Sequence, residues 1–399
     1  MTDAVIVSTA RTPIARARKG SLVSLDAFQL AEVVVPAVLE RSGVPARDVD
    51  GLVLAEAYQG GGVLSRNVAV RLGLADVAGI ATNQHCAGGL AAVAIAAGSV
   101  RAGMDQVVIA GGTESLTNSA MTTTRRGPDG NPVTWVSASH PETADAPAFD
   151  MSITVGENTA RELGLTRLDV DEWAAYSHGQ AIASIDGGYF VDQIVPVNVP
   201  QPDGTTKVFD TDEFPRRGTT VETLAQLRLL HPELPDATVT AGNAAGLNDA
   251  AAAVTVVSGE YAAAHGLAPL ARIRSWASVG LAPALTGLGP SLAIPKALDR
   301  AGLTLADIDL FEVNEAFCSV PVATIRKLGI KPEIVNVNGS GASLGHPIAA
   351  TGARMVVTMV DELRRRGSSL GVVSMCAGVG VPRPRRAFRG RARRVPPPR

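Results

Sequence analysis

Cys86 is the residue of this sequence whose surroundings most favour chemistry. It follows a short apolar, β-prone segment, residues 77–82, and precedes a helix-prone segment, residues 90–100, that carries no charge on any face. A thiol at a helix N-terminus lies beside unpaired N–H groups and the positive end of the dipole, which lower its pKa from about 8.5 and favour the nucleophilic thiolate. Gly88 and Gly89 leave room for a ligand to approach. The pattern predicts a nucleophile, and the plainer alternative is a buried structural cysteine.

His346 could serve as the base for such a thiol. It follows a glycine-rich turn, residues 339–345, and precedes Pro347 and a helix-prone segment, residues 347–362. Proline suits the first turn of a helix, so the histidine is expected to be held rigidly at the helix start. Most lone histidines are structural or solvated, but a candidate thiolate elsewhere makes Cys–His pairing the functional interpretation.

A second cysteine and an asparagine follow two predicted strands of the C-terminal half. Cys376 comes after the apolar run 370–373, and its thiol could exchange a proton with a carbon acid; packing alone is the alternative. Asn314 comes after the run 308–313, where capping of a following helix is the structural interpretation.

Four stretches together resemble the motifs of the thiolases, the acetyl-CoA C-acyltransferases. They are Asn83–Gly89, Asn314–Phe317, Asn338–Pro347 and Ser374–Gly378, and the resemblance extends from about residue 4 to residue 380. It implies a five-layer αβαβα fold of two similar α/β halves with an inserted loop domain.

The resemblance also implies roles for the candidate residues. Cys86 would carry the acyl group, and His346 would take its proton and then bind the thioester oxygen. Cys376 would act as the general acid and base. Asn314 would hold a water that stabilises the enolate oxygen, and the backbone N–H groups of Cys86 and Gly378 would form a second oxyanion site.

The reaction implied is the reversible cleavage of 3-oxoacyl-CoA by CoA to acetyl-CoA and a shortened acyl-CoA, or the condensation of two acetyl-CoA. CoA is then a substrate, and no cofactor or metal is expected. Two alternatives stay open. One is a thiolase-like protein that binds acyl-CoA without turnover. The other is a condensing enzyme of the ketoacyl synthase type, which commonly uses one cysteine and two histidines.

Several positions expected to contact the substrate depart from the family pattern. Ala245 replaces a serine often found there, Met151 aligns with a histidine near the pantetheine, and His231 aligns with an aromatic residue. The resemblance assigns substrate and CoA contacts to Arg216, Ala245, Gly246, Phe317 and Met151.

The alternation of strand-like and helix-like segments predicts a parallel α/β sheet. A first strand and its exit loop are expected at 4–14, with further strands at 49–57, 77–82, 106–112, 271–277, 308–313 and 334–338. Helices are expected at 34–39, 67–72, 168–187 and 243–253. The predicted units are residues 1–265 with an inserted loop domain at about 118–241, residues 266–380, and a tail at 381–399. Residues 201–204 are expected to form a hairpin tip.

Composition describes a soluble, well-packed globular protein. Apolar residues make up 46% and charged residues 19% of 399 residues, and the net charge is −2. Three cysteines indicate free thiols in a reducing compartment, and we expect a cytoplasmic protein with no signal peptide and no membrane span. No nucleic acid partner is expected, and the resemblance implies a homodimer or homotetramer.

The segment after Gly380 departs most from the family. Thiolases continue there with an apolar strand, but here prolines stand at 382 and 384, and eight arginines lie between 383 and 399. Proline cannot donate to a central ladder, so this segment is not expected to form a buried strand. A basic arm or a departure from the natural reading frame would each explain it.

Overall fold

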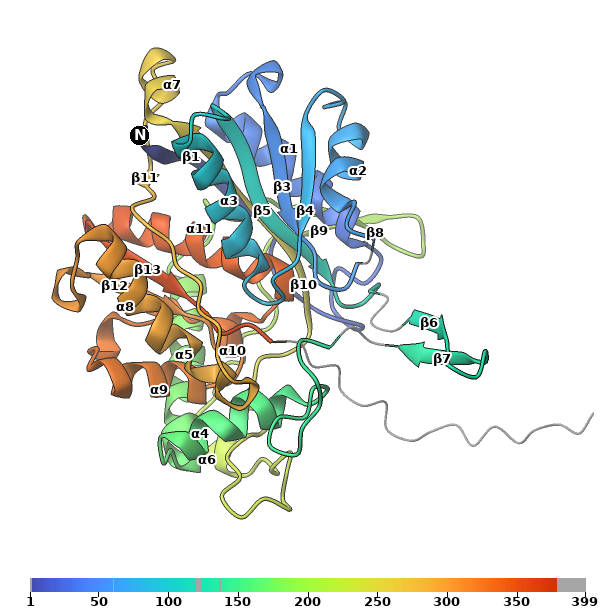
Figure 1. Ribbon diagram of the computed structural model, residues 1–399, viewed down its shortest axis with the longest axis vertical. Coiled ribbons are helices and arrows are strands. Elements are labelled where there is room, and N and C mark those ends of the chain that lie inside the picture. Colours follow the sequence, from blue (N-terminus) through green and yellow to red (C-terminus); the bar gives the residue numbers. More distant parts are fainter. Residues whose placement is uncertain (1, 60, 120–122, 136–137, 379–399) are drawn as a thin grey trace, which may run out of the picture.

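A seven-stranded mixed sheet dominates the computed structural model, which describes residues 2–59, 61–119, 123–135 and 138–378 (Figure 1). Its order is β11-β1-β10-β5-β3-β4, with β2 paired to β10. β3 is parallel to β4 and β5, whereas β10 is antiparallel to β1 and β5. The strands are β1 (Ala4–Arg11), β2 (Ala15–Arg16), β3 (Gly51–Ala55), β4 (Ala78–Thr82), β5 (Val107–Ser115), β10 (Asn248–Ser258) and β11 (Ala271–Arg272).

This sheet separates two helical layers because successive side chains of a strand point to opposite faces. Val5 and Val7 of β1 pack with α1 (Ala27–Ser42) and α2 (Leu64–Arg71). Ala4 and Ile6 pack instead with α3 (Gly88–Arg101) and α11 (Ile348–Arg366). The sheet is therefore covered on both faces.

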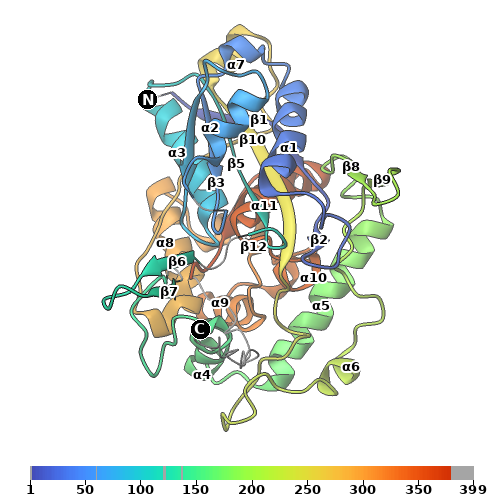
Figure 2. The ribbon, with the colours of Figure 1, turned by 90° about the vertical axis from the view of Figure 1, so that its right-hand side faces the viewer.

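The helix α11 lies between this sheet and a second, smaller one. The second sheet is a parallel pair, β12 (Leu310–Val313) and β13 (Gly371–Ser374). Leu310 packs on the α11 side of the pair, while Phe311 packs with α8 (Gly289–Ala301) and α9 (Ser319–Leu328). Figures 1 and 2 show the resulting order of layers, in which α3 and α11 form the middle one. This is the predicted five-layer αβαβα arrangement.

The segment between β5 and β10 adds no strand to the main sheet among its described residues. The helix predicted at 168–187 is α5, and the side chain of Thr166 caps its start together with Asp169. Gly204 adopts a positive φ at the predicted hairpin tip. The limits of an inserted domain stay a prediction. The elements of this segment are β6 (Thr123–Arg126), β7 (Pro132–Trp135), a π-helix (Ser152–Glu157), α4 (Asn158–Glu162), α5 (Arg167–Asp186), β8 (Val197–Pro200), β9 (Thr206–Phe209) and α6 (Val221–Ala225).

The predicted helix at 243–253 is wrong, because most of this segment belongs to β10. Alanine is the best helix former, which made the run of alanines misleading. In the structure the whole of β10 is buried, and it pairs with β1 on one side and β5 on the other. Pairing on both sides overrides the local preference, and the small side chains let α1 and α11 approach the sheet.

Three other predictions need correction. Only Ala271 and Arg272 of the predicted strand 271–277 pair, and they join the first sheet. The predicted strand 334–338 is irregular, because Asn336 has a positive φ and its side chain bonds the backbone N–H and C=O of Val313 at 2.8 Å. The predicted buried strand 77–82 is β4, which lies at the sheet edge and leaves Ile80 51% exposed.

The remaining helices are short. They are α7 (Gly259–Ala264), α10 (Gly341–Leu344) and 3-10 turns at Ala46–Asp48, Pro283–Leu288, Leu305–Asp307 and Pro332–Ile334. The predicted tail, 381–399, lies outside the described residues.

Candidate active site

Two glycines bring the first turns of α3 and α11 into backbone contact. A Cβ atom at Gly89 would lie 2.7 Å from the backbone of α11, and one at Gly352 would lie 2.4 Å from the backbone nitrogen of Leu90. Cys86 precedes α3 by two residues, and His346 precedes α11 by two residues. The crossing of the helices therefore brings both reactive side chains to one place.

The backbone just before Cys86 is held in an uncommon conformation. His85 has a φ of 51°, in the left-handed region that non-glycine residues rarely adopt. Its N–H donates to the side-chain oxygen of Asn83 at 2.9 Å, which supports the turn. Strain of this kind is frequent at active sites, where the surrounding structure fixes a reactive side chain.

The thiol of Cys86 is buried and neutral at rest. Its Sγ–H donates to the carbonyl oxygen of Gly378 across 3.6 Å. Burial raises the pKa of Cys86 to about 11; backbone hydrogen bonds from Gly378 and from Cys86 itself act in the opposite direction, and the charge of Glu114 adds to the rise. The prediction that the helix N-terminus lowers this pKa is therefore wrong for the ligand-free protein, because desolvation outweighs the helix end.

Cys376 and Asn314 are placed together by the parallel pair of β12 and β13. The N–H of Asn314 donates to the carbonyl of Ser374 at 3.0 Å, so both residues lie just beyond the same end of the pair. Cys376 is 2% exposed; burial raises the pKa of its thiol, and a charge on Cys86 would raise it further.

Asn314 does not cap a helix. The following helix, α9, begins at Ser319 with Cys318 at its cap position. Both polar atoms of the Asn314 side chain are buried without a hydrogen-bond partner among the residues that the structure describes. Because an unpaired buried amide is costly, these atoms are suited to a substrate oxygen or a water.

His346 is held by its backbone and is neutral. Its N–H donates to the side-chain oxygen of Asn248 at 2.9 Å, and the residue is 7% exposed. Burial, together with the positive charge of Arg354, lowers the pKa of His346 to about 3. Its Nε2 atom is buried and meets no hydrogen-bond partner within the described part of the chain.

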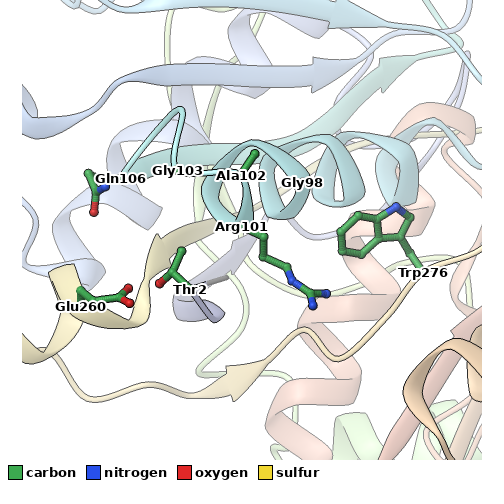
Figure 3. A pocket seen from close by; sticks show the side chains of 8 residues that line it. All are labelled: Thr2, Gly98, Arg101, Ala102, Gly103, Gln106, Glu260 and Trp276. Atoms are coloured by element: carbon green, nitrogen blue, oxygen red, sulfur yellow. The ribbon is translucent and has the colours of Figure 1, made fainter.

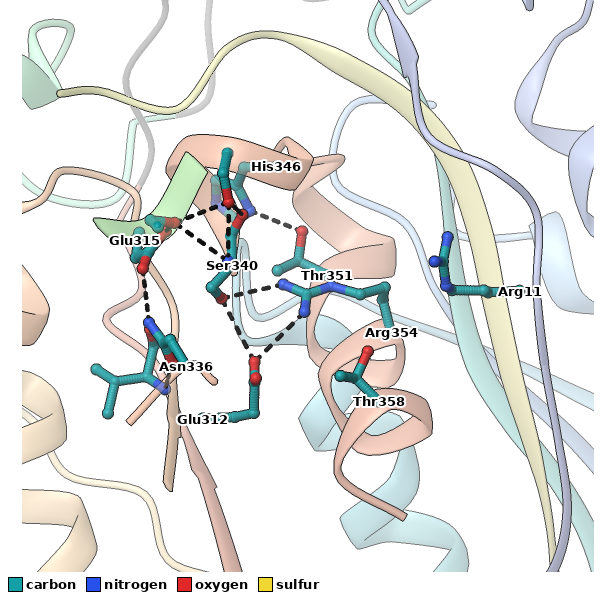
Figure 4. Close-up of polar contacts among 12 residues, drawn as sticks. Arg11, Glu312, Glu315, Asn336, Ser340, His346, Thr351, Arg354 and Thr358 are labelled. Carbon is teal, nitrogen blue, oxygen red and sulfur yellow. Dashed lines mark hydrogen bonds and ion pairs between the residues drawn. The ribbon is translucent and has the colours of Figure 1, made fainter. Parts of the chain in front are cut away.

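A buried polar network fixes the elements behind His346 and Asn314 (Figure 4). Arg354 of α11 forms an ion pair with Glu312 at 3.4 Å and donates to the hydroxyl of Ser340 at 3.2 Å. Glu315 accepts hydrogen bonds from Trp173 at 2.9 Å and from Asn336 at 2.8 Å. Burial raises the pKa of Glu312, and the positive charge of Arg354 opposes this rise. Such a network ties β12, which carries Asn314, to the helix that follows His346.

Two side chains near Cys86 were missed in the sequence. Glu114 accepts the N–H of Ala349, in the first turn of α11, at 3.1 Å, and burial raises its pKa to about 7. Tyr58 has a buried hydroxyl with no partner among the described residues; burial raises its pKa, and the charges of Cys86 and Glu114 add to the rise. The sequence contained a signal for Glu114. It is a carboxylate near the end of a glycine-containing strand, and that strand runs parallel to the one before Cys86.

Two of the five predicted substrate contacts lie beside the reactive residues. The sulfur of Met151 lies 3.1 Å from the Cβ position of Gly378, whose carbonyl contacts Cys86. Phe317 packs its ring 3.0 Å from the Cβ position of Gly156, in the π-helix that follows Met151.

The other three form a second group. The N–H of Ala245 donates to the carbonyl of Ala316 at 3.0 Å, and the ring of Phe214 lies 2.4 Å from the Cβ position of Gly246. The guanidinium of Arg216 lies 5.5 Å from the centre of the same ring. Burial, and the nearby charge of Arg16, lower the pKa of Arg216. Gly246 and Arg216 therefore lie beside Phe214, whereas Ala245 contacts the residue that precedes Phe317.

A surface cavity of about 670 Å³ lies elsewhere, at the C-terminal end of α3 (Figure 3). α3 has 14 residues, so this cavity is separated from the Cys86 end by about 20 Å of helix. None of the predicted site residues lines it; the lining is Thr2, Gly98, Arg101, Ala102, Gly103, Gln106, Glu260 and Trp276.

Metal-binding clusters and membrane-spanning helices are absent from the described ranges of the chain. Within them, no three or more His, Cys, Asp or Glu side chains are grouped so as to hold a metal ion. No helix there is long and apolar enough to cross a membrane.

Comparisons with known proteins identify the family. Models of the thiolase N-terminal and C-terminal domains match residues 4–260 and 267–383. An acetyl-CoA acetyltransferase of Pseudomonas aeruginosa is 41% identical, with 95% of this chain and 98% of that protein covered. A 3-ketoacyl-CoA thiolase of Bacillus subtilis is 40% identical, with 96% and 98% covered. The crystal structure of the Bacillus anthracis acetyl-CoA acetyltransferase superposes with a TM-score of 0.87 at 36% identity, with 95% and 97% covered.

A five-layer αβαβα fold with this full-length similarity defines an acyltransferase that uses acyl-CoA and CoA. The chain belongs to the thiolase family, and its fold is the thiolase fold. The resemblance seen in the sequence is thereby confirmed, and the ketoacyl synthase alternative has no support.

Proposed function

We propose that this thiolase transfers an acetyl group between acetoacetyl-CoA and CoA through an acyl-Cys86 intermediate, and condenses two acetyl-CoA in reverse. The contact between the two halves supports this proposal most directly: Cys86 Sγ lies 3.6 Å from the carbonyl oxygen of Gly378, two residues after Cys376. Cleavage of a carbon–carbon bond beside a thioester needs a nucleophile and a separate proton donor, and two thiols from different halves supply them.

Cleavage begins when Cys86 Sγ attacks the 3-keto carbon. Since Cys86 and His346 both rest in their neutral forms, the thiol proton moves to His346 Nε2 as the sulfur–carbon bond forms and an electron pair moves onto the keto oxygen. When this adduct collapses, the C2–C3 bond breaks, and C2 takes the proton of Cys376 to give acetyl-CoA. The thiol of a second CoA then attacks the acyl group, and Cys86 leaves as a thiolate. The proton of the CoA thiol restores the Cys376 thiol, and the proton held on His346 Nε2 returns to Cys86.

Backbone N–H groups are proposed to stabilise the negative charge that develops in this reaction. Burial raises the pKa of the Cys86 thiol, and backbone hydrogen bonds at Gly378 and Cys86 act against this rise. We propose the N–H groups of these two residues as oxyanion donors, each worth about 2.7–4 kcal/mol. The unpaired amide of Asn314, directly or through a water, would serve the enolate oxygen.

The position of Met151 supports a short acyl group. Its sulfur lies against Gly378 and so limits the space next to Cys86. One of the two relatives named above is an acetyl-CoA acetyltransferase, while the other is a 3-ketoacyl-CoA thiolase. Arg216, Ala245, Gly246 and Phe317 are proposed to contact CoA and the acyl chain.

We also propose a cytoplasmic homodimer or homotetramer that needs no cofactor. The support for an oligomer is an apolar surface at one edge of the main sheet, formed by α2, the edge strand β4 and α3. Its exposed residues are Val63, Val70, Ile80 and Ile95. Exposed apolar side chains along an edge strand are typical of a protein interface.

Thiolysis kinetics test the substrate assignment. The wild-type protein should give a higher kcat/KM with acetoacetyl-CoA than with 3-oxooctanoyl-CoA. Met151→Ala should raise kcat/KM for the longer substrate, whereas Met104→Ala, at a 77% exposed methionine, should change neither value. A wild-type preference for the longer substrate would contradict the short-chain proposal, and absence of any turnover would support the binding-only alternative.

A further inference from the structure

A threonine of α11 contacts the imidazole of His346 from the side opposite to the unpaired nitrogen. Thr351 is fully buried, and its Oγ1 lies 2.7 Å from His346 Nδ1. The same Oγ1 lies 2.8 Å from the carbonyl oxygen of Pro347. Figure 4 shows the contact between the threonine and the histidine as a dashed line.

The donors and acceptors of His346, Thr351 and Pro347 determine which nitrogen of the His346 ring carries the proton. A hydroxyl has one hydrogen to donate and a carbonyl can only accept, so the hydrogen of Thr351 is directed to Pro347. The hydroxyl oxygen then accepts a hydrogen bond from Nδ1–H of His346. The opposite assignment would put an N–H on Nε2, which is buried and faces no acceptor in the described part of the chain.

The helix itself holds the hydroxyl in place. Thr351 stands four residues after Pro347, and threonine in a helix commonly bonds the carbonyl of residue i−4. A β-branched side chain has few rotamers available in a helix, so this bond fixes the direction of Oγ1. The oxygen then presents its lone pair to His346.

We infer that Thr351 is a positioning residue that fixes His346 as the Nδ1–H tautomer and leaves Nε2 free to take the proton of Cys86. This inference rests on the proposed function, in which Nε2 accepts that proton. A histidine held in the other tautomer presents an N–H to the thiol and cannot accept its proton. Thr351 therefore acts through His346 and touches neither the sulfur nor the substrate.

Variants of Thr351 separate the effect of its hydroxyl group from the effect of its side-chain packing. Thr351→Val keeps the branched shape and removes the hydroxyl, and it should slow acetylation of Cys86 by acetyl-CoA about 10- to 100-fold. Thr351→Ser keeps the hydroxyl and should restore most of the rate. Thr324→Val is the matched control, because Thr324 is also buried and bonds the carbonyl four residues earlier, but it contacts no histidine.

Nitrogen-15 NMR of histidine-labelled protein reads the tautomer directly. The chain has six histidines, and the signal lost in His346→Asn identifies the residue. The wild-type protein and Thr351→Ser should show the proton on Nδ1, and Thr351→Val should show a changed or mixed tautomer at an unchanged melting temperature. A wild-type proton on Nε2 would overturn the inference even if Thr351→Val fails to fold.

The rates distinguish this inference from the proposed function. If the wild-type protein forms no acetyl-Cys86, the proposed function fails. If the wild type is acetylated and Thr351→Val reacts at the rate of Thr324→Val, the proposed function stands and the role of Thr351 is wrong.

Discussion

The two halves present their reactive cysteines from sheets of very different size. Cys86 follows β4 of a seven-stranded sheet that is covered by helices on both faces. Cys376 follows β13, which pairs with β12 and with no further strand among the described residues. The other edge of β13 lines a cavity of about 630 Å³, together with residues 273–281 and apolar side chains of α8 and α11.

This difference shows that two cysteines in similar local sequence patterns can be held in place by different interactions. Backbone pairing and alternating side chains hold the sheet before Cys86. The strand before Cys376, β13, pairs with β12 alone among the described strands and packs on α8 and α11, and the ion pair of Arg354 with Glu312 ties α11 to β12.

The largest expected effect separates the chemical roles of the two cysteines. Cys86→Ala should abolish both the exchange of label between acetyl-CoA and CoA and the cleavage of acetoacetyl-CoA, with losses on the order of 10⁴-fold or more. Cys376→Ala should reduce cleavage by about 10²- to 10⁴-fold, since it removes a general acid, yet retain exchange. Both rates can be measured by chromatography of the CoA esters. If a folded Cys376→Ala protein lost the exchange of label, the proposal that Cys86 carries the acyl group while Cys376 only transfers a proton would be contradicted.

The second effect is the pH dependence of the rate at which Cys86 is alkylated. A pKa raised to about 11 means that the thiolate fraction, and hence the rate of alkylation by iodoacetamide, rises about tenfold per pH unit between 7 and 10. A thiol activated by the helix end would instead reach a plateau near or below pH 8.5. Peptide mapping assigns the label, with Cys86→Ser as the control. A plateau at neutral pH in the ligand-free protein would favour the helix-end explanation.

The contact that joins the halves should be intolerant of a single methyl group. Gly352→Ala places a Cβ 2.4 Å from the backbone of α3, and overpacking of this kind costs about 1–3 kcal/mol. Gly179→Ala, in α5, meets no atom within 4 Å and should be neutral or stabilise by up to about 1 kcal/mol. Urea denaturation measures both. If Gly352→Ala and Gly179→Ala had the same free energy of unfolding, the crossing of α3 and α11 would not be tightly packed.

The smallest effect is a local difference in hydrogen exchange. Amides of β5 lie between two paired strands, whereas amides of β13 on the cavity side have no strand partner among the described residues. We expect those amides of β13 to exchange at least about tenfold faster than amides of β5. Mass spectrometry of peptic peptides can compare the two strands, and equal protection would mean that the edge of β13 is covered.

The sequence located the candidate site residues more reliably than some of the strands between them. Cys86, His346 and Cys376 each stand at a junction between a strand or turn and a helix or glycine, and such junctions are visible in local composition. Their catalytic roles stay a prediction. The helix expected at 168–187 and the hairpin around Gly204 were predictable for the same reason.

The failures have non-local causes. β10 looked like a helix because pairing with β1 and β5 cannot be seen in a run of alanines. The pKa of Cys86 was predicted in the wrong direction because burial depends on α11 and Gly378, which lie more than 250 residues away. The roles of Glu114 and Thr351 likewise depend on contacts that form only when α11 packs against the sheet.

Intact-mass spectrometry after mixing with acetoacetyl-CoA tests the central claim most directly. The account predicts one acetyl group per chain, mapped to Cys86, which is discharged when CoA is added and is absent from Cys86→Ala. A folded protein that turns over acetoacetyl-CoA without an adduct at Cys86, or with the adduct at Cys376, would contradict it.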